Sequence, residues 1–218
     1  MLLPLAAHVP AVARAYGIRR RLPRTDAAAL TFDDGPLPEG TPAVLDALDA
    51  AGAKATFFLM GEQVERRPEL AREIAARGHA IGVHGYRHTL LLRRTRRGLA
   101  DDLDRGAALI GAATGAAPVY YRAPYGVFST ASLALARERG WIPLLWSRWG
   151  RDWERRATGE AIARRAGGRL AGGDIVLLHD ADYYSSAGSW RRTVEALPAI
   201  LAAGSTLELS WVPVTHET

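Results

Sequence analysis

Short apolar runs alternate with amphipathic helical patterns along most of the chain, and this alternation restricts its fold more than any other feature. The apolar runs are typical of buried β-strands and lie at 28–32, 53–60, 79–84, 119–122, 141–146, 174–179 and 206–212. The helical patterns lie between them and begin near Thr41, Glu62, Thr95, Ser129, Thr158 and Ser189. Strand-to-helix units followed by a last strand predict a mainly parallel α/β sheet, open or closed into a barrel.

Several of the expected helices carry their own start and stop signals. Thr41 is expected to cap a helix whose first residue is Pro42, because proline suits the first helical position. Glycines follow the expected ends of three helices, at Gly52, Gly78 and Gly140. These signals agree with the boundaries that the apolar pattern indicates.

The composition fits one globular domain and removes several kinds of chemistry. At 218 residues, 48% hydrophobic and 23% charged, the chain is long enough to bury a full core. It contains no cysteine. Disulfides, cysteine-ligated zinc and thiol catalysis are therefore excluded, and any metal must be bound by histidine and carboxylate side chains.

The chain is basic, with a formal net charge of +5, and Lys54 is its only lysine. Its arginines gather in three clusters, at Arg19, Arg20, Arg21 and Arg24, at Arg93, Arg94, Arg96 and Arg97, and at Arg148, Arg151, Arg155 and Arg156. Such clusters are most often solvated faces, and the alternative is peripheral contact with a membrane or an anionic cell-wall polymer. Nucleic acid is not an expected partner, because Trp141, Trp146, Trp149 and Trp153 lie mostly on or after an apolar strand rather than interleaving with basic residues.

The first ten residues are apolar but do not have the pattern of a signal peptide. Pro4, His8 and Pro10 interrupt the apolar stretch, and no positive region precedes it. The stretch is also too short to span a bilayer, so a docked terminal helix is expected, with a membrane-surface helix as the alternative. This pattern leaves a cytoplasmic and a membrane- or wall-associated location both open.

Unusual polar residues follow the ends of five expected strands. They are Asp33-Asp34-Gly35-Pro36, His84 with His88, Arg122, Asp152 and His179-Asp180. Because the carboxyl ends of parallel strands meet at one edge, these residues are expected to converge there. Each has an ordinary alternative as a turn, core or surface residue. Together, one carboxylate and two imidazoles suit a divalent metal, and a second carboxylate and a third histidine remain for proton transfer.

Five segments of the chain resemble, in order, the motifs of a known enzyme family. They are Thr31-Phe-Asp-Asp-Gly35, His84-Gly-Tyr-Arg-His88, Arg122-Ala-Pro-Tyr-Gly126, Asp152-Trp153 and Val176-Leu-Leu-His-Asp180. The family is that of the polysaccharide deacetylases of carbohydrate esterase family four, the NodB-homology domain, and the resemblance covers about residues 25–203. It implies an α/β fold, a distorted, incomplete (β/α) barrel of about seven parallel strands. It also implies a catalytic domain at 25–218 after an N-terminal extension at 1–24, which is expected to be helical.

The resemblance implies a hydrolase that removes acetyl groups from N-acetylated sugars in a polysaccharide or oligosaccharide, peptidoglycan or chitin-like, and releases acetate. Hydrolysis of O-acetyl or N-formyl groups by the same machinery is the alternative. A non-catalytic carbohydrate-binding relative is less favoured, because such a relative would be expected to lose an aspartate or histidine of the motifs. The implied cofactor is a divalent metal, Zn²⁺ first, with Co²⁺ or Mn²⁺ as alternatives, and the implied partner is an N-acetylated glycan.

The resemblance also implies which residues bind the metal and activate water. By its motifs, Asp34, His84 and His88 would hold the divalent ion, and Asp33 would be the general base. Arg122 would pair with Asp33 and fix the orientation of its carboxylate.

The remaining roles concern the leaving group and the pocket. By the same resemblance, His179 would protonate the leaving amine, and Asp152 would hold it as imidazolium. The alternative for Asp152 is a surface ion pair with the neighbouring arginines. The backbone N–H of Tyr125 would stabilise the oxyanion, and Trp153 and Leu177 would line the pocket for the acetyl methyl group.

The second motif departs from the family pattern at two positions. Gly85 stands where the family usually has serine or threonine, and Thr89 stands where it usually has proline. The two histidines and their spacing are retained, but a hydroxyl that would brace the turn between them is missing.

Asp180 is the family's ordinary residue after the catalytic histidine, and no separate role is assigned to it.

Overall fold

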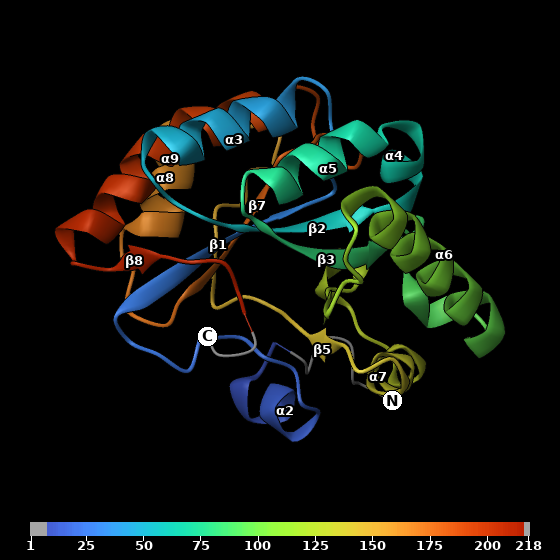
Figure 1. Cartoon of the computed structure of the whole chain (residues 1–218). Helices are drawn as coiled ribbons and strands as arrows, with labels where there is room; N and C mark the ends of the chain where they lie inside the picture. The colour runs from blue at the N-terminus through green and yellow to red at the C-terminus, as the bar shows by residue number, and fades with distance from the viewer. Residues whose placement is uncertain (1–7, 216–218) are drawn as a thin grey trace.

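A parallel β-sheet lies at the centre of the molecule, in a computed structural model that describes residues 8–215 (Figure 1). Its strands are β1 (Ala27–Asp33), β2 (Thr56–Met60), β3 (Ala80–Gly85), β4 (Tyr120–Tyr121), β5 (Ile142–Pro143), β6 (Arg148–Trp149), β7 (Ile175–His179) and β8 (Ser210–Trp211). The strand order is β5-β4-β3-β2-β1-β7-β6, β8 pairs with β1, and all these pairings are parallel. The predicted mainly parallel α/β sheet is therefore confirmed.

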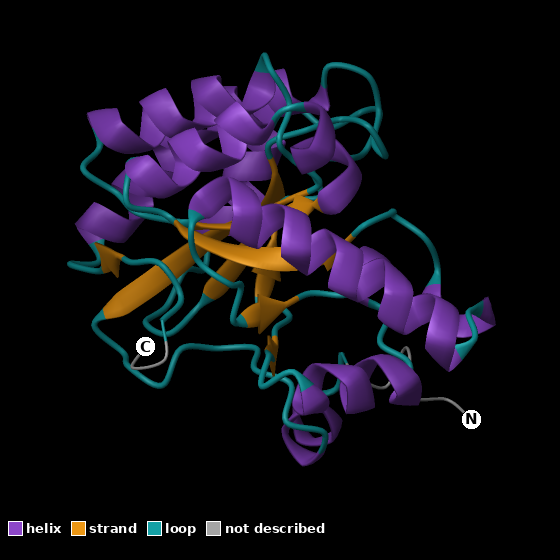
Figure 2. Cartoon of the chain, turned by 45° about the vertical axis from the view of Figure 1, so that its right-hand side comes forward, coloured by secondary structure: helices purple, strands orange, loops and turns teal. Residues whose placement is uncertain are grey.

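Helices surround this sheet on several sides (Figure 1). They are α2 (Pro10–Ala15), α3 (Gly40–Ala50), α4 (Gly61–Arg66), α5 (Pro68–Ala76), α6 (Arg96–Thr114), α7 (Thr130–Glu138), α8 (Gly159–Gly167) and α9 (Ser189–Thr206), with short 3₁₀ turns η1 (Leu91–Arg93) and η2 (Pro124–Gly126). Figure 2 shows the strands as a middle layer between a large group of helices and the pair α2 and α7. Among residues 8–215, no helix combines the length and apolar character that crossing a membrane requires.

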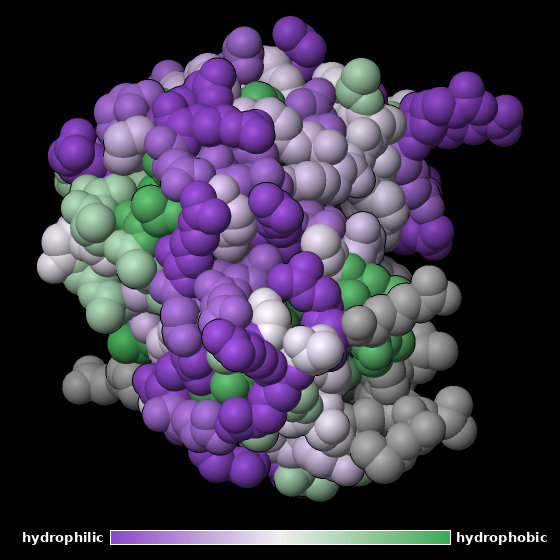
Figure 3. Space-filling model, turned by 90° about the vertical axis from the view of Figure 1, so that its right-hand side faces the viewer, coloured by the Kyte–Doolittle hydropathy of each residue, from purple (hydrophilic) through white to green (hydrophobic). Residues whose placement is uncertain are grey.

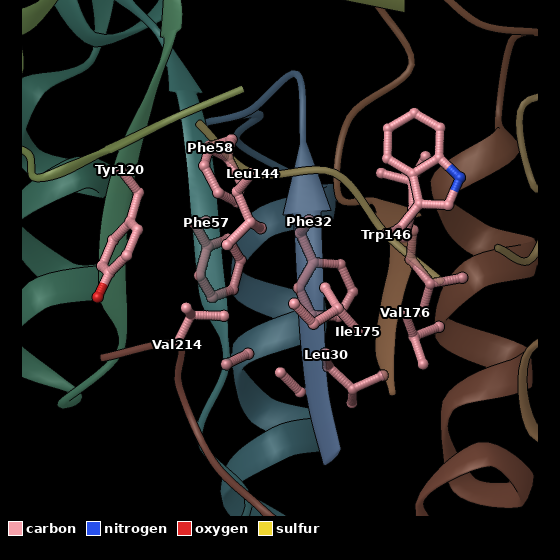
Figure 4. Packing of buried hydrophobic residues seen from close by; sticks show 14 of the residues in the cluster. Leu30, Phe32, Phe57, Phe58, Tyr120, Leu144, Trp146, Ile175, Val176 and Val214 are labelled. Atoms are coloured by element: carbon pink, nitrogen blue, oxygen red, sulfur yellow. The ribbon is translucent and has the colours of Figure 1, made fainter. Parts of the chain in front are cut away.

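The core is packed against both faces of the central strands. All residues of β1 are buried, which explains the uninterrupted apolar run that ends at Asp33. Phe32 of β1 stacks on Phe57 of β2, with ring centroids 5.1 Å apart, and both rings are fully buried (Figure 4). Burial on both faces holds the end of β1 rigidly, so the polar residues that follow it have defined positions.

The helix starts expected at Thr95, Ser129, Thr158 and Ser189 agree with the structure, and the cap expected at Thr41 does not. Thr95, Ser129 and Thr158 are N-caps whose side chains accept hydrogen bonds from backbone N–H groups of the first turn. The predicted cap at Thr41 is wrong, because α3 begins at Gly40, two residues before Pro42, and its N-cap is Glu39. The Thr41 hydroxyl is instead fully buried, where it accepts a hydrogen bond from the backbone of the preceding turn and donates one to a carboxylate.

Three other boundaries differ from the sequence pattern. The predicted strand at 206–212 is only β8, because α9 continues to Thr206, whose hydroxyl donates to the Ala202 carbonyl. The helical pattern that begins near Glu62 is two helices, α4 and α5, which are separated at Arg67 because proline follows it. The short strand β6 was not predicted, since two residues give no detectable periodicity.

The first part of the chain packs beside the sheet. Helix α2 falls within the predicted extension at 1–24, of which residues 1–7 lie outside the described residues. After α2, single backbone bridges join Arg19 to Leu144 and Arg21 to Asp174. The division of the chain at residue 24 stays a prediction.

On the face of the molecule that carries α6, hydrophilic residues predominate and hydrophobic ones form small separate areas (Figure 3).

Candidate active site

The polar residues of the strand ends converge on one cavity of about 340 Å³. Eight of the residues predicted for the site line it, namely Asp33, Asp34, His84, His88, Tyr125, Trp153, Leu177 and His179. The other two, Arg122 and Asp152, are fully buried and contact lining residues from behind. All ten predicted residues therefore belong to one site.

Strand register explains why residues far apart in the sequence meet here. Asp33 at the end of β1 is paired with His179 at the end of β7. His84 lies near the end of β3, the second strand away from β1 on its other side. Successive strand residues normally face opposite sides of a sheet. Asp34 has a φ of 79°, which ends the extended conformation and lets its carboxylate face the cavity beside that of Asp33.

Asp34, His84 and His88 form a compact group of candidate metal ligands. One ligand atom of each lies within 4.8 Å of the other two, and both histidine Nε2 atoms are 3.5 Å from Asp34 Oδ1. His84 Nδ1 lies 2.8 Å from the Arg122 carbonyl oxygen. A carbonyl only accepts, so Nδ1 carries the proton and Nε2 offers its lone pair to the group.

The electrostatics of this group suit a divalent cation. Burial lowers the pKa of His84 and of His88 to about 3, so both rings are neutral at physiological pH and can act as ligands. Burial raises the pKa of Asp34 to about 7, and its Oδ1 is buried without a hydrogen-bond partner. A bound cation would satisfy that oxygen and favour its charged form. The donor set of two imidazoles and one carboxylate fits a catalytic metal site.

A buried ion pair holds Asp33. Arg122 Nη1 donates to Asp33 Oδ1 at 2.6 Å and to Thr31 Oγ1 at 2.9 Å. Further guanidinium contacts reach the Leu144 and Leu145 carbonyls at 3.3 Å, so the arginine is fixed on several sides. Burial raises the pKa of Asp33, although the Arg122 charge opposes the rise. The second oxygen, Oδ2, remains directed toward the candidate ligands, 3.8 Å from His84 Nε2.

His179 is held by Asp152 on the other side of the cavity. Its Nδ1 lies 2.9 Å from Asp152 Oδ1, and its backbone N–H donates to Oδ2 at 2.7 Å. The Thr193 hydroxyl also donates to Oδ2, at 2.8 Å. Asp152 is fully buried, so it is not a surface ion-pair partner of the nearby arginines. Burial lowers the pKa of His179, but the charge and hydrogen bond of Asp152, together with the charges of Asp34 and Asp33, outweigh it and raise this pKa to about 10.

Aromatic rings form much of the cavity wall. Trp153 lies edge-on to His179, with ring centroids 5.5 Å apart. His88 is enclosed by two tyrosines: Tyr125 lies edge-on and Tyr184 is stacked, each at a centroid distance of 4.4 Å. The Tyr184 hydroxyl donates to Glu62 of α4, which ties the loop after β7 to that helix.

Five lining residues were not predicted from the sequence, namely Gly126, Trp146, Trp149, Tyr184 and Ser185. The run Tyr183-Tyr184-Ser185, which begins three residues after the end of the fifth motif, was the one available signal, because aromatic residues near a site residue indicate binding. Trp146 ends the strand expected at 141–146 and Trp149 follows it, and neither was assigned to the site.

A carboxylate from α6 braces the turn of the second motif. Asp102 Oδ2 accepts from the backbone N–H groups of Tyr86 and Arg87, at 2.9 and 3.5 Å. Gly85 has a φ of 112°, and a Cβ there would lie 3.2 Å from the same oxygen. Asp102 therefore contacts the turn that the sequence left without a hydroxyl at Gly85. No sequence signal identified it, because it is 16 residues from Tyr86.

Asp180 supports the turn after β1 from within. It is fully buried, and the Thr41 hydroxyl donates to its Oδ2 at 2.5 Å. A Cβ at Gly35 would lie 2.3 Å from the same oxygen, so only glycine lets the turn approach this closely. Burial raises the pKa of Asp180 to about 7.

Comparison with known proteins agrees with this geometry. The family model for polysaccharide deacetylases matches residues 21–142. A peptidoglycan-N-acetylglucosamine deacetylase of Bacillus cereus is 34% identical over 173 residues, which cover 79% of this chain and 61% of that protein. A chitooligosaccharide deacetylase of Bradyrhizobium is 38% identical over 171 residues, which cover 78% of this chain and 76% of that protein.

The fold has a close counterpart among solved structures. A crystal structure of a peptidoglycan N-acetylglucosamine deacetylase superposes with a TM-score of 0.86 and 29% identity, over 97% of this chain and 94% of the other. This likeness confirms the predicted distorted, incomplete (β/α) barrel of about seven parallel strands. The family model and the relatives confirm what the five motifs predicted, and the chain belongs to the polysaccharide deacetylase family of hydrolases.

Proposed function

We propose that this chain hydrolyses the acetamide group of N-acetylated sugar residues in a glycan, releasing acetate and leaving a free amine. One observation carries the proposal: a single cavity places the group of Asp34, His84 and His88 between a carboxylate, Asp33, and a charged histidine, His179. Relatives named for peptidoglycan and for chitooligosaccharides support a glycan that contains N-acetylglucosamine as the substrate class.

We propose Zn²⁺ as the ion that Asp34, His84 and His88 hold, with Co²⁺ or Mn²⁺ as alternatives. Two neutral imidazoles and one carboxylate are a common ligand set for catalytic zinc, and they leave positions open for substrate. When bound, the ion supplies Lewis-acid activation of water and of the amide carbonyl.

Asp33 is the general base of the proposed reaction. Arg122 occupies its Oδ1 at 2.6 Å, which leaves Oδ2 as the oxygen that faces the candidate ligands. Oδ2 can therefore take a proton from a water molecule as that water attacks the acetamide carbon. Because the guanidinium is fixed by other contacts, Asp33 keeps this orientation throughout the reaction.

The acetyl group is bound by the wall on the side of His179. Trp153 and Leu177 line the cavity there, and we propose that they contact the acetyl methyl group. Tyr125 also lines the cavity, within the η2 turn, and its backbone N–H is assigned to the developing oxyanion.

His179 protonates the leaving nitrogen. Its Nδ1 is bound to Asp152, so Nε2 carries the proton that faces the cavity, 3.9 Å from Asp34 Oδ2. With a pKa of about 10 the ring is charged at neutral pH. An amine leaves readily only after its nitrogen is protonated, so this charged histidine favours amide hydrolysis over ester hydrolysis.

An acetate-release screen over chitooligosaccharides, peptidoglycan and acetylxylan, with zinc supplied, tests the proposal. We expect acetate from one or both N-acetylated glycans, and about 10²- to 10⁴-fold slower release from the Asp33→Asn variant. Acetate from acetylxylan alone would identify an O-acetyl esterase, and formate from an N-formylated sugar would identify a deformylase. Binding without release of any acid would identify a non-catalytic carbohydrate-binding protein.

A further inference from the structure

Trp149 presents an exposed aromatic surface at the cavity. It lies on the edge strand β6 and is 42% exposed, whereas its neighbour Trp146 is buried. Among the exposed large hydrophobic side chains of residues 8–215, Trp149 and Tyr125 are the ones that line this cavity. Exposed aromatic rings beside a polar cleft indicate contact with a ligand.

The neighbours of Trp149 hold it in a defined position. Its ring centroid is 5.6 Å from that of Trp153 and 5.9 Å from that of Trp146. Its backbone is paired with Leu177 of β7, and the next N–H, of Gly150, donates to the Leu177 carbonyl. A ring fixed in this way loses little conformational entropy when a ligand binds.

A single aromatic ring, that of Trp153, contacts both Trp149 and His179, the proposed acid. The centroid distances are 5.6 and 5.5 Å, so Trp153 lies between the two. The cavity of about 340 Å³ is near the lower limit of the size range for small-ligand sites, about 300–1,000 Å³. It therefore has room for about one sugar, the one whose amide reacts, and an adjoining sugar can extend toward the solvent past Trp149, which lines the cavity and is exposed.

We infer that Trp149 is a stacking platform for the sugar ring that adjoins the one losing its acetyl group. Pyranose rings have C–H faces that pack against aromatic rings, which gives an exposed indole a suitable partner in a glycan chain. The inference rests on the proposed function and adds a substrate contact to it, one that favours oligomeric glycans over single N-acetylated sugars.

Kinetics with substrates of two sizes test this role. The kcat/KM for a four-residue chitooligosaccharide is divided by the kcat/KM for a small aryl acetate ester, which has no sugar to stack. In Trp149→Ala this ratio is expected to fall about 10- to 100-fold, mainly through a higher KM for the oligosaccharide. Trp149→Phe should retain most of the ratio, because it keeps an aromatic face.

Leu207→Ala is the matched control, because Leu207 is 49% exposed but does not line the cavity. Its ratio should equal that of the wild type. An unchanged ratio in Trp149→Ala would overturn the inference. Equal losses on both substrates would also overturn it, because they would indicate a structural defect rather than a lost sugar contact.

Binding measurements separate this inference from the proposed function. Calorimetric titration of Asp33→Asn with the same oligosaccharide reports binding without turnover, and adding Trp149→Ala should weaken that binding by about the same factor. A wild type that releases no acetate from any glycan refutes the proposed function, yet a Trp149-dependent affinity would still support the platform. Equal affinities with and without Trp149, or no binding at all, would refute the platform.

Discussion

The adjacent carboxylates Asp33 and Asp34 have similar burial but different partners. One oxygen of Asp33 is bound to a fixed guanidinium, whereas Asp34 Oδ1 faces two neutral imidazoles and has no hydrogen-bond partner. An arginine-bound carboxylate keeps its position during proton transfer, and an unpartnered one can ligate a cation. The environment, rather than the residue type, thus separates the proposed base from the proposed ligand.

Replacing each carboxylate by its amide tests this separation. Asp33→Asn should retain about one zinc ion per chain and lose activity by about 10²- to 10⁴-fold, the usual effect of removing a general base. Asp34→Asn and His84→Ala should lose metal. Elemental analysis of the purified variants and assays of acetate release measure both properties. Loss of metal from Asp33→Asn but not from Asp34→Asn would mean that the two roles are reversed.

The contact between Asp152 and His179 predicts a shift in the pH dependence of the reaction. The acid must be protonated, so activity should fall at high pH as His179 loses its proton, near its pKa of about 10. In Asp152→Asn the charge that raises this pKa is gone while the desolvation that lowers it remains, so the alkaline limb should move to lower pH. Acetate release measured from about pH 5 to pH 10 tests this shift. An unshifted alkaline limb with a near-normal rate would show that Asp152 does not raise the pKa of His179.

At the level of elements, α6 supports the turn that joins β3 to the second candidate ligand. Asp102→Ala removes the acceptor for the Tyr86 and Arg87 N–H groups, so His88 should be held less firmly. We expect zinc affinity to fall about 10-fold or more, as is typical for residues that orient metal ligands. Competition with a chelating dye measures it, and Asp101→Ala, which changes an exposed neighbour, is the control. Equal zinc affinity in the two variants would contradict the role.

Elements with local signals could be predicted, and those that depend on distant contacts could not. Thr95, Ser129 and Thr158 mark helix starts through hydrogen bonds to N–H groups a few residues away, which sequence spacing reveals. The strand ends revealed the site residues in the same way. The roles proposed for Asp102 and Trp149 depend on neighbours brought close by the fold, so no local pattern identified these residues. The cap predicted at Thr41 failed for the same reason, since its hydroxyl is bound to the distant Asp180.

For the whole molecule, the arginine clusters of the sequence are largely engaged in local contacts. The Arg148 guanidinium donates at 2.8 Å to each of three carbonyls at the end of α8, those of Arg165, Ala166 and Arg169. Arg21 pairs with Asp174 at 2.8 Å, and Arg24 pairs with Asp26 at 2.6 Å. Many of the clustered arginines in the described part of the chain therefore contact neighbouring groups of the same chain, and contact with a membrane or an anionic wall polymer stays a prediction.

Metal binding and global stability should be linked through pH. Asp34 has a pKa of about 7 in the folded, metal-free chain, so below pH 7 a cation must displace a proton from it. His84 and His88, with pKa values of about 3, are neutral above pH 5 and release none. Zinc affinity should therefore rise up to about 10-fold per pH unit between pH 5 and 7 and level off above pH 7.

The increase in Tm caused by a fixed zinc concentration should follow the same course, because ligand binding to the folded state adds stability in proportion to the logarithm of affinity. In metal-free protein the raised pKa of Asp34 stabilises the fold below about pH 4, and this contribution is lost as pH approaches 7. The Tm difference between zinc-bound and metal-free protein therefore grows as pH rises toward 7. Thermal melts with and without zinc from pH 5 to pH 8 measure it. A zinc-dependent increase that is constant across this range would show that binding displaces no proton, and Asp34 would then not be the protonated ligand.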